Sequence, residues 1–133
     1  MDLNHNNIGP FDCFEICKLL KCKESQLSWL NLKNNQVTDE AARYLAEAIN
    51  NNNCQLRTLS LSFNDISDTG AQHLVKAINN NNCQLRTLDF TENNITDIRT
   101  QHFAEAINND NCQLHPLILS GNKILRYWST AFG

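Results

Sequence analysis

Cysteine is a residue type that often holds metal ions, and three cysteines of this sequence recur at one spacing. Cys54, Cys83 and Cys112 follow one another at intervals of 29 residues. A structural zinc site needs ligands at closer spacing, typically C-x₂₋₄-C with further cysteine or histidine. Neither histidine nor a carboxylate shares this column of equivalent positions. We therefore expect reduced cysteines that fill an apolar core.

The other cysteines and the histidines do not build a catalytic or metal site either. Cys13 and Cys17 lie four residues apart in an expected helix, which disfavours a disulfide, so both are predicted to be buried and reduced. Cys22 has no counterpart in its column and is the cysteine expected to be exposed. His73 and His102 share a column but lack a third ligand. Because no nucleophile with its base, Gly-rich phosphate loop or aligned carboxylate pair is recognisable, the sequence predicts a non-enzymatic protein without cofactor or metal.

Arginine and tryptophan are the residue types that most often dominate protein binding, and both occur at informative positions. Arg57 and Arg86 are also separated by 29 residues, and two neighbouring guanidinium groups can hold one carboxylate. The alternative is a solvated pair bonded to Asp89 or Glu92, which would contribute little.

These spacings come from a repeat of 29 residues that must position every candidate side chain. Each repeat reads L-x-x-L-x-L-x-x-N-x-I/V. Apolar and polar residues alternate around Leu59 and Leu61, which predicts a short strand with one buried face. A regular repeat of this length is typical of a solenoid, which offers a long surface rather than one pocket.

The second half of each repeat has the period of a helix. Ala42, Leu45, Ala46 and Ile49 show the spacing i, i+3, i+4, i+7, which predicts one buried helical face. The same spacing recurs one repeat later and, with changes, in the other repeats. Ser/Thr-Asp pairs precede these helices, and we expect their side chains to accept hydrogen bonds from the first turn of the same helix. Asparagine-rich tetrads end the helices as loops.

Strand, helix and loops repeated in this way predict an α/β solenoid. The parallel sheet is expected on the concave side and the helices on the convex side, since helices need about 10 Å between axes and strands only about 4.8 Å. We expect a single domain over residues 1–133. It comprises a partial first repeat (1–26), repeats from about 27, 56 and 85, a truncated last repeat (114–124) and a C-terminal cap (125–133).

This pattern resembles the leucine-rich-repeat family, in particular its ribonuclease-inhibitor-like subtype, over about residues 3–124. Ribonuclease inhibitors, NLR-type receptors, several bacterial effectors and the GTPase activator of the Ran protein share the subtype. The resemblance implies a horseshoe segment. It also implies a ladder of buried asparagines that bond to the backbone, at Asn6, Asn35, Asn64, Asn93 and Asn122.

Residues between the buried leucines are predicted to face the concave side, where a partner would bind. The expected binding residues are Trp29, Asn31, Lys33, Arg57, Ser60, Phe63, Arg86, Asp89, Glu92, His115 and Ile118. Trp29 stands in a column of Thr58, Thr87 and Pro116, and Phe63 in a column that is otherwise polar or glycine. For Phe63 the alternative is a ring that packs against the loop.

Charge and composition limit the kind of partner. The net charge is −3, with no basic patch, so we expect neither nucleic acid nor a membrane as partner. Residues 1–15 lack the apolar segment of a secretory signal, which predicts a cytoplasmic protein, or one translocated into a host cytosol if it is a bacterial effector. The unpaired first strand, residues 1–5, is a second expected contact site.

The function expected from these features is binding of another protein, as an inhibitor or regulator of an enzyme. Two alternatives remain: a GTPase activator, which would need a catalytic arginine on a loop, and a fragment of a larger innate-immune-type sensor. Asn34, Phe63 and Glu92 occupy the relevant loop position, and none is arginine.

Overall fold

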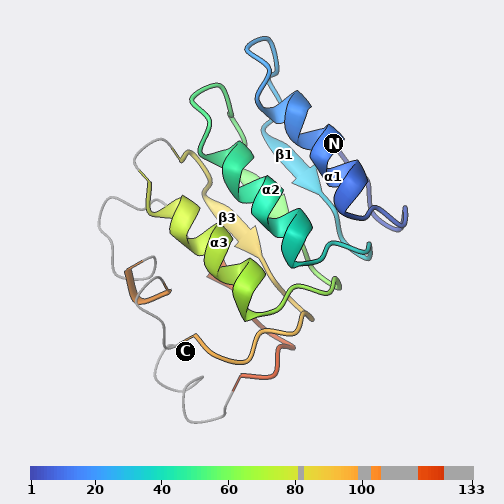
Figure 1. Cartoon of the computed structure of the whole chain (residues 1–133), viewed down its shortest axis with the longest axis vertical. Coiled ribbons are helices and arrows are strands. Elements are labelled where there is room, and N and C mark those ends of the chain that lie inside the picture. The colour runs from blue at the N-terminus through green and yellow to red at the C-terminus, as the bar shows by residue number, and fades with distance from the viewer. Residues whose placement is uncertain (81–82, 99–102, 106–116, 125–133) are drawn as a thin grey trace.

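The computed structural model describes residues 1–80, 83–98, 103–105 and 117–124. Helices lie side by side in one layer, and a parallel sheet lies behind them (Figure 1). Along the chain the elements are α1 (Pro10–Leu20), β1 (Trp29–Asn31), α2 (Asp39–Ile49), β2 (Thr58–Ser60), α3 (Asp68–Ile78), β3 (Thr87–Asp89) and β4 (Leu117–Ile118). Strand and helix alternate as the repeat predicts. The expected cap at residues 125–133 lies outside the described residues, as do Cys112, His102 and His115.

The sheet has four parallel strands in the order of the sequence. Leu30 pairs with Leu59, Leu59 with Leu88, and Leu88 with Leu117. The pairing therefore advances by one repeat at each strand. The backbone of residues 1–5 continues the sheet at its outer edge, because Asp2 bridges to Asn31 and the Leu3 N–H donates to the Asn31 carbonyl at 2.9 Å.

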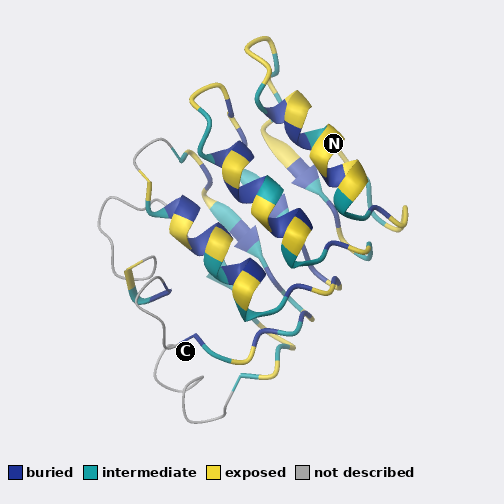
Figure 2. Cartoon of the chain, viewed as in Figure 1, coloured by how far each residue is buried: buried dark blue, intermediate teal, exposed yellow. Residues whose placement is uncertain are grey.

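The core lies between the helix layer and the sheet, as the dark blue faces of Figure 2 show. Leu59 on β2 and Leu45 on α2 are both fully buried. The predicted helical faces are confirmed, since Ala42, Ala46 and Ile49 are buried as well. The helices α1 to α3 thus shield one side of the sheet, and the buried leucine positions of the repeat are scaffold.

Asn64 shows how neighbouring repeats are joined. Its side-chain amide donates to the carbonyls of Leu32 and Leu61, at 2.9 and 3.1 Å, and its carbonyl oxygen accepts from the Val37 N–H at 2.9 Å. Asn93 repeats this arrangement one repeat later, and Asn35 and Asn122 make comparable bonds with less burial. The structural interpretation of the asparagine ladder is confirmed for these four positions.

Asn6 does not share that role, so the prediction was wrong at the first position of the ladder. The residue is exposed, and its side chain donates within its own turn, to the Asn4 carbonyl at 3.0 Å. The other ladder asparagines reach back to a carbonyl of the preceding strand, as Asn64 does to Leu32, whereas the Asn6 amide bonds within its own turn.

The helix caps also differ from expectation. Neither Thr38 nor Ser67 accepts a hydrogen bond from its own helix. Asp39, the first residue of α2, instead accepts from the Ser67 N–H at 2.7 Å and from the Gly70 N–H at 3.1 Å. Asp68 repeats this with the N–H of Thr96. A carboxylate therefore caps the start of the following repeat, which ties adjacent repeats together at their helix ends.

Gly70 is required by this contact. A Cβ atom at position 70 would lie 2.4 Å from Oδ1 of Asp39. Such an approach is too close for any side chain, so the inter-repeat cap and the glycine depend on each other.

Candidate functional site

The face of the sheet opposite the helices carries no packed element among the residues described (Figure 1). We call it the open face; it is the side that sequence analysis treated as concave. The strands and the turns that follow them present its side chains. On the strands these are Trp29, Asn31, Thr58, Ser60, Thr87, Asp89 and Ile118, and in the turns they are Lys33, Phe63 and Glu92. Two further exposed residues, Arg57 and Arg86, lie directly before β2 and β3.

Backbone hydrogen bonds set the spacing of this face. The Ser28 carbonyl accepts from the N–H groups of Arg57 and Thr58, at 2.8 and 3.1 Å. The Arg57 carbonyl accepts in the same way from Arg86 and Thr87, at 2.8 and 3.0 Å. Equivalent residues of adjacent repeats therefore stand about one strand spacing, about 4.8 Å, apart.

Two large aromatic side chains are exposed on this face. Trp29 is 43% exposed at the start of β1, and Phe63 is 44% exposed in the turn after β2. The exposed part of each ring does not contribute to the hydrophobic core. Exposed apolar groups of this kind mark interaction sites when they gather on one surface.

The backbone at Phe63 makes its side chain more informative. Its φ is 56°, and the equivalent residues His5, Asn34, Glu92 and Gly121 also have positive φ. The turn therefore demands a left-handed residue, which costs a side chain with a Cβ about 1–2 kcal/mol. Phenylalanine is poorly suited to that turn, so the turn geometry does not explain its presence.

The ring of Phe63 is about half exposed. The Lys33 ammonium lies 5.4 Å from the ring centroid, within cation–π range. Lys33 and Phe63 thus form one mixed apolar and cationic spot at the strand ends.

Arg57 and Arg86 have no acidic partner within the described part of the chain. The ion pairs found there are Lys18–Glu15 at 3.0 Å and Arg43–Glu47 at 3.3 Å. The Asp89 carboxylate instead accepts from the N–H and hydroxyl of Thr91. The alternative in which Asp89 or Glu92 neutralises the arginines is therefore not realised.

Two predicted binding residues serve the backbone. Asn31 accepts from the Lys33 N–H at 3.0 Å, and Asp89 accepts from the Thr91 N–H at 2.8 Å. Both bonds close a short turn along the strand. This role was not predicted from the sequence. Its sequence signal is a polar residue, Asn31 or Asp89, two positions before the amide that it bonds.

The remaining predicted residues divide by exposure. Lys33 and Glu92 are exposed, whereas Ser60 and Ile118 are only partly so. Ser62 points to the same side as Ser60, with the two hydroxyl oxygens 3.4 Å apart, but it is buried. The accessible part of the open face is therefore its two ends, around Trp29 with the arginines and around Phe63.

The expected contact edge at residues 1–5 is partly closed by its own side chains. Asp2 Oδ1 accepts from the backbone and side-chain N–H groups of Asn4, at 3.2 and 2.8 Å. The Asn4 carbonyl accepts from Asn6. Bonds of this kind reduce the tendency of an edge strand to pair with another chain.

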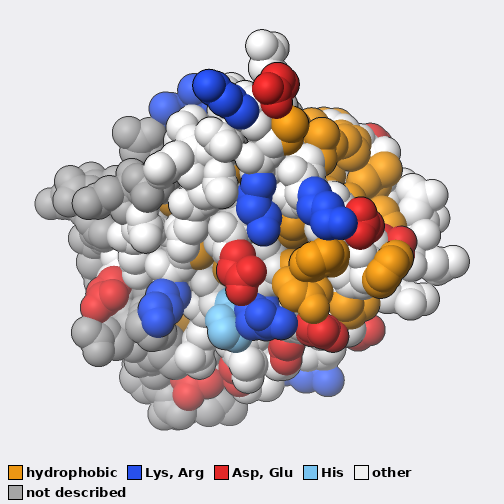
Figure 3. Space-filling view, turned by 45° about the horizontal axis from the view of Figure 1, so that its top comes forward, with side chains coloured by type: hydrophobic (Ala, Val, Ile, Leu, Met, Phe, Trp, Pro, Cys, Tyr) orange, Lys and Arg blue, Asp and Glu red, His pale blue; other side chains and the backbone are white. Residues whose placement is uncertain are grey.

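A second apolar region lies on α1, at one end of the helix layer (Figure 3). Phe11 is 77% exposed, and Phe14 and Leu19 are also exposed. The position of Phe11 is held by Glu40 and Thr69 in the next two repeats. This region was not predicted from the sequence, although Phe11 is the apolar residue in a helical column that is otherwise polar.

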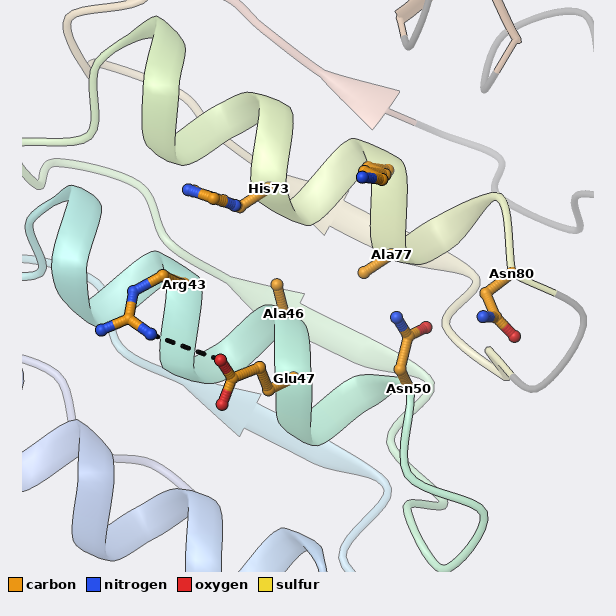
Figure 4. Close-up of a pocket in the computed structure, with 8 residues that line it drawn as sticks. Arg43, Ala46, Glu47, Asn50, His73, Ala77 and Asn80 are labelled. Atoms are coloured by element: carbon orange, nitrogen blue, oxygen red, sulfur yellow. Dashed lines mark hydrogen bonds and ion pairs between the residues drawn. The ribbon is translucent and has the colours of Figure 1, made fainter.

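A shallow groove of about 300 Å³ runs between α2 and α3 (Figure 4). Arg43, Glu47 and Asn50 line it from α2, and His73 lies on α3. The Arg43–Glu47 ion pair occupies part of its wall. These side chains do not form a catalytic set within the described residues, because none is a nucleophile held by a base.

Cys13, Cys17 and Cys54 are buried core residues as expected, whereas Cys83 is only partly buried. Burial raises the pKa of the Cys13 and Cys17 thiols to about 12 and also raises the pKa of Cys54. Cys22 is exposed, as predicted, and no disulfide joins the described cysteines. The same residues contain no group of three metal-ligating side chains, and no helix among them is long and apolar enough to span a bilayer.

Comparison with known proteins agrees with the repeat architecture. A family model described as Leucine Rich repeat matches residues 27–46, 52–75 and 81–98. No curated protein matches the sequence. Each matched segment includes a strand with its asparagine turn, and the strands that they contain are neighbours in the sheet. Leucine-rich repeats are typically binding scaffolds rather than enzymes. The matched repeats, the alternating strands and helices and the parallel sheet together show an α/β solenoid fold built from leucine-rich repeats.

Proposed function

We propose that this protein binds another protein through the open face of its sheet and regulates an enzyme by covering it. The observation that carries the proposal is the pair of exposed aromatic residues, Trp29 and Phe63, on a face where no described element packs. Tryptophan and arginine are enriched among the residues that dominate binding energy. Arg57 and Arg86 lie on the same face without acidic partners in the described region.

The regulatory part of the proposal rests on the resemblance to ribonuclease-inhibitor-like repeats. The 29-residue unit with a full helix supports that subtype. A hydrogen-bonded sheet suits the coverage of a folded partner, because little backbone order has to be gained on binding.

The size of the open face sets how much of the protein a folded partner would have to contact. Strand segments spaced by about 4.8 Å, with about six residues each at about 3.3 Å, give a patch of roughly 500 Å² for five segments. A typical stable interface covers about 800 Å² on each partner. The partner must therefore also contact the turns, and Phe63 lies in one of them.

The test begins with capture of partners from the source cells by the tagged protein, identified by mass spectrometry. Trp29→Ala and Phe63→Ala are then compared with Phe11→Ala by calorimetry. Phe11 is the matched control, since it is an exposed aromatic residue on α1. We expect each open-face variant to lose at least about tenfold in affinity, which corresponds to about 1.4 kcal/mol.

A different pattern would refute the proposal. If Phe11→Ala abolished binding while Trp29→Ala and Phe63→Ala bound normally, the partner would dock on the helix side. Circular dichroism of each variant establishes that a lost affinity is not a lost fold.

A further inference from the structure

We propose that Arg57 and Arg86 form a carboxylate-binding pair that selects a partner with an acidic side chain at the Trp29 end of the open face. The inference rests on the proposed function and names the chemistry of the partner at that site. The two arginines are exposed, occupy equivalent positions in adjacent repeats, and have no acidic partner in the described residues.

The backbone holds the two side chains in matching positions. The Arg57 carbonyl accepts from the Arg86 N–H at 2.8 Å, and Thr58 pairs with Thr87 in the sheet. The two Cα atoms are therefore about one strand spacing, about 4.8 Å, apart. The two guanidinium groups can therefore reach a common anion, which would offset the repulsion between two neighbouring cations.

The acidic side chains of the open face do not supply the anion between Arg57 and Arg86. Asp89 is bonded to Thr91, and Glu92 lies beyond the other end of the strand, in the column of Phe63. Lys33 is also at that far end, over the Phe63 ring. The start of β2 and β3 is thus the cationic end of the face.

A single carboxylate fits this arrangement better than a phosphate polymer. Guanidinium groups bind planar carboxylates through paired hydrogen bonds. Binding of a nucleic acid draws on many phosphate contacts, whereas this face offers few cations and also carries Asp89 and Glu92. Trp29, paired with Thr58 in the sheet, supplies an apolar surface beside the arginines for the carbon atoms next to the carboxylate.

The arginine Nε–H signals in ¹H–¹⁵N spectra test the proposal without the natural partner. The probe is an acetylated and amidated Gly-Glu-Leu-Gly peptide, and the matched control is Gly-Gln-Leu-Gly, which lacks only the charge. We expect the signals of Arg57 and Arg86 to shift together and saturably with the glutamate peptide. Arg43, already paired with Glu47 at 3.3 Å, is the internal control and should not shift.

Lysine substitutions assign the signals and test the geometry. Arg57→Lys keeps the charge but loses the paired hydrogen bonds, so we expect at least a fivefold weaker response of Arg86. Equal shifts at Arg43, equal shifts with the glutamine peptide, or the absence of a shift at millimolar peptide would overturn the carboxylate pair. A stronger response to inorganic phosphate than to the glutamate peptide would also overturn it.

The outcome is separable from that of the proposed function. Capture that depends on Trp29 and Phe63 but is unaffected by Arg57→Gln and Arg86→Gln, which remove the charge, would leave protein binding intact and remove only the acidic selectivity. A specific response to the glutamate peptide, without any capture that depends on Trp29, would support the carboxylate pair and contradict the proposed binding of a protein through the open face.

Discussion

The Asn64→Ala substitution removes a buried amide that joins two repeats. In the native structure its oxygen accepts from the Val37 N–H at 2.9 Å, and its nitrogen donates to the carbonyls of Leu32 and Leu61 at 2.9 and 3.1 Å. The two carbonyls keep another donor each, since Asn35 also bonds to Leu32 at 3.0 Å and Asn93 to Leu61 at 2.8 Å. In the described part of the chain, the Val37 N–H donates to no acceptor other than the Asn64 oxygen.

The cost can be built from these contacts. A buried N–H left without an acceptor costs about 1–3 kcal/mol, and each weakened carbonyl bond costs up to about 1 kcal/mol. We therefore expect Asn64→Ala to lower the free energy of unfolding by about 2–4 kcal/mol. That is a large fraction of the roughly 5–15 kcal/mol that stabilises a typical domain.

Urea unfolding followed by circular dichroism measures this difference. Asn35→Ala is the matched control, because it removes the same kind of side chain from a partly exposed position, where water can replace some bonds. We expect its cost to be smaller by at least about 1 kcal/mol. Equal costs for the two variants, or a cost below about 0.5 kcal/mol for Asn64→Ala, would refute the argument that the ladder is stabilised by satisfied buried amides.

Further predictions concern the core, the inter-repeat cap and the thiols. Leu59→Asp places an unpaired charge at a fully buried position and should abolish the folded circular dichroism signal. Gly70→Ala should lower the free energy of unfolding, measured by urea unfolding, by about 1–3 kcal/mol through overpacking. The added methyl group would meet the Asp39 carboxylate, so replacement of Asp39 should reduce that loss. Iodoacetamide labelling mapped by mass spectrometry should modify Cys22 well before Cys13 and Cys17, since only Cys22 is exposed. Because the two buried thiols ionise near 9.0 when unfolded but at about 12 when folded, thermal melts should show stability falling as the pH rises from about 9 towards 12.

The repeat made most of the fold predictable. Residues in one column meet the same surroundings in every inner repeat, so Leu59 and Leu88, or Asn64 and Asn93, share one environment. A correct interpretation of one residue therefore applies to the equivalent residue in each inner repeat. The exposed first position, Asn6, is the exception, because its amide bonds within its own turn rather than to a neighbouring repeat.

The errors arose where the partner belongs to another repeat. A Ser/Thr-Asp pair looks the same whether its side chains cap their own helix or the following one, and only the structure shows Asp39 bonded to Ser67 and Gly70. The roles of Asn31 and Asp89 were missed for a related reason, since a polar residue on an open face reads equally as a binding group or as a turn former. Exposure of Trp29 and Phe63 was predictable, because both break the character of their columns.

Hydroxyl-radical footprinting of the captured complex tests the open-face account most directly. Oxidation rates of individual side chains, measured by mass spectrometry, report which exposed aromatic residues the partner covers. We predict that complex formation lowers the oxidation rates of Trp29 and Phe63, at present 43% and 44% exposed, and leaves that of Phe11 unchanged. Protection of Phe11 with unchanged oxidation of Trp29 and Phe63 would contradict the account.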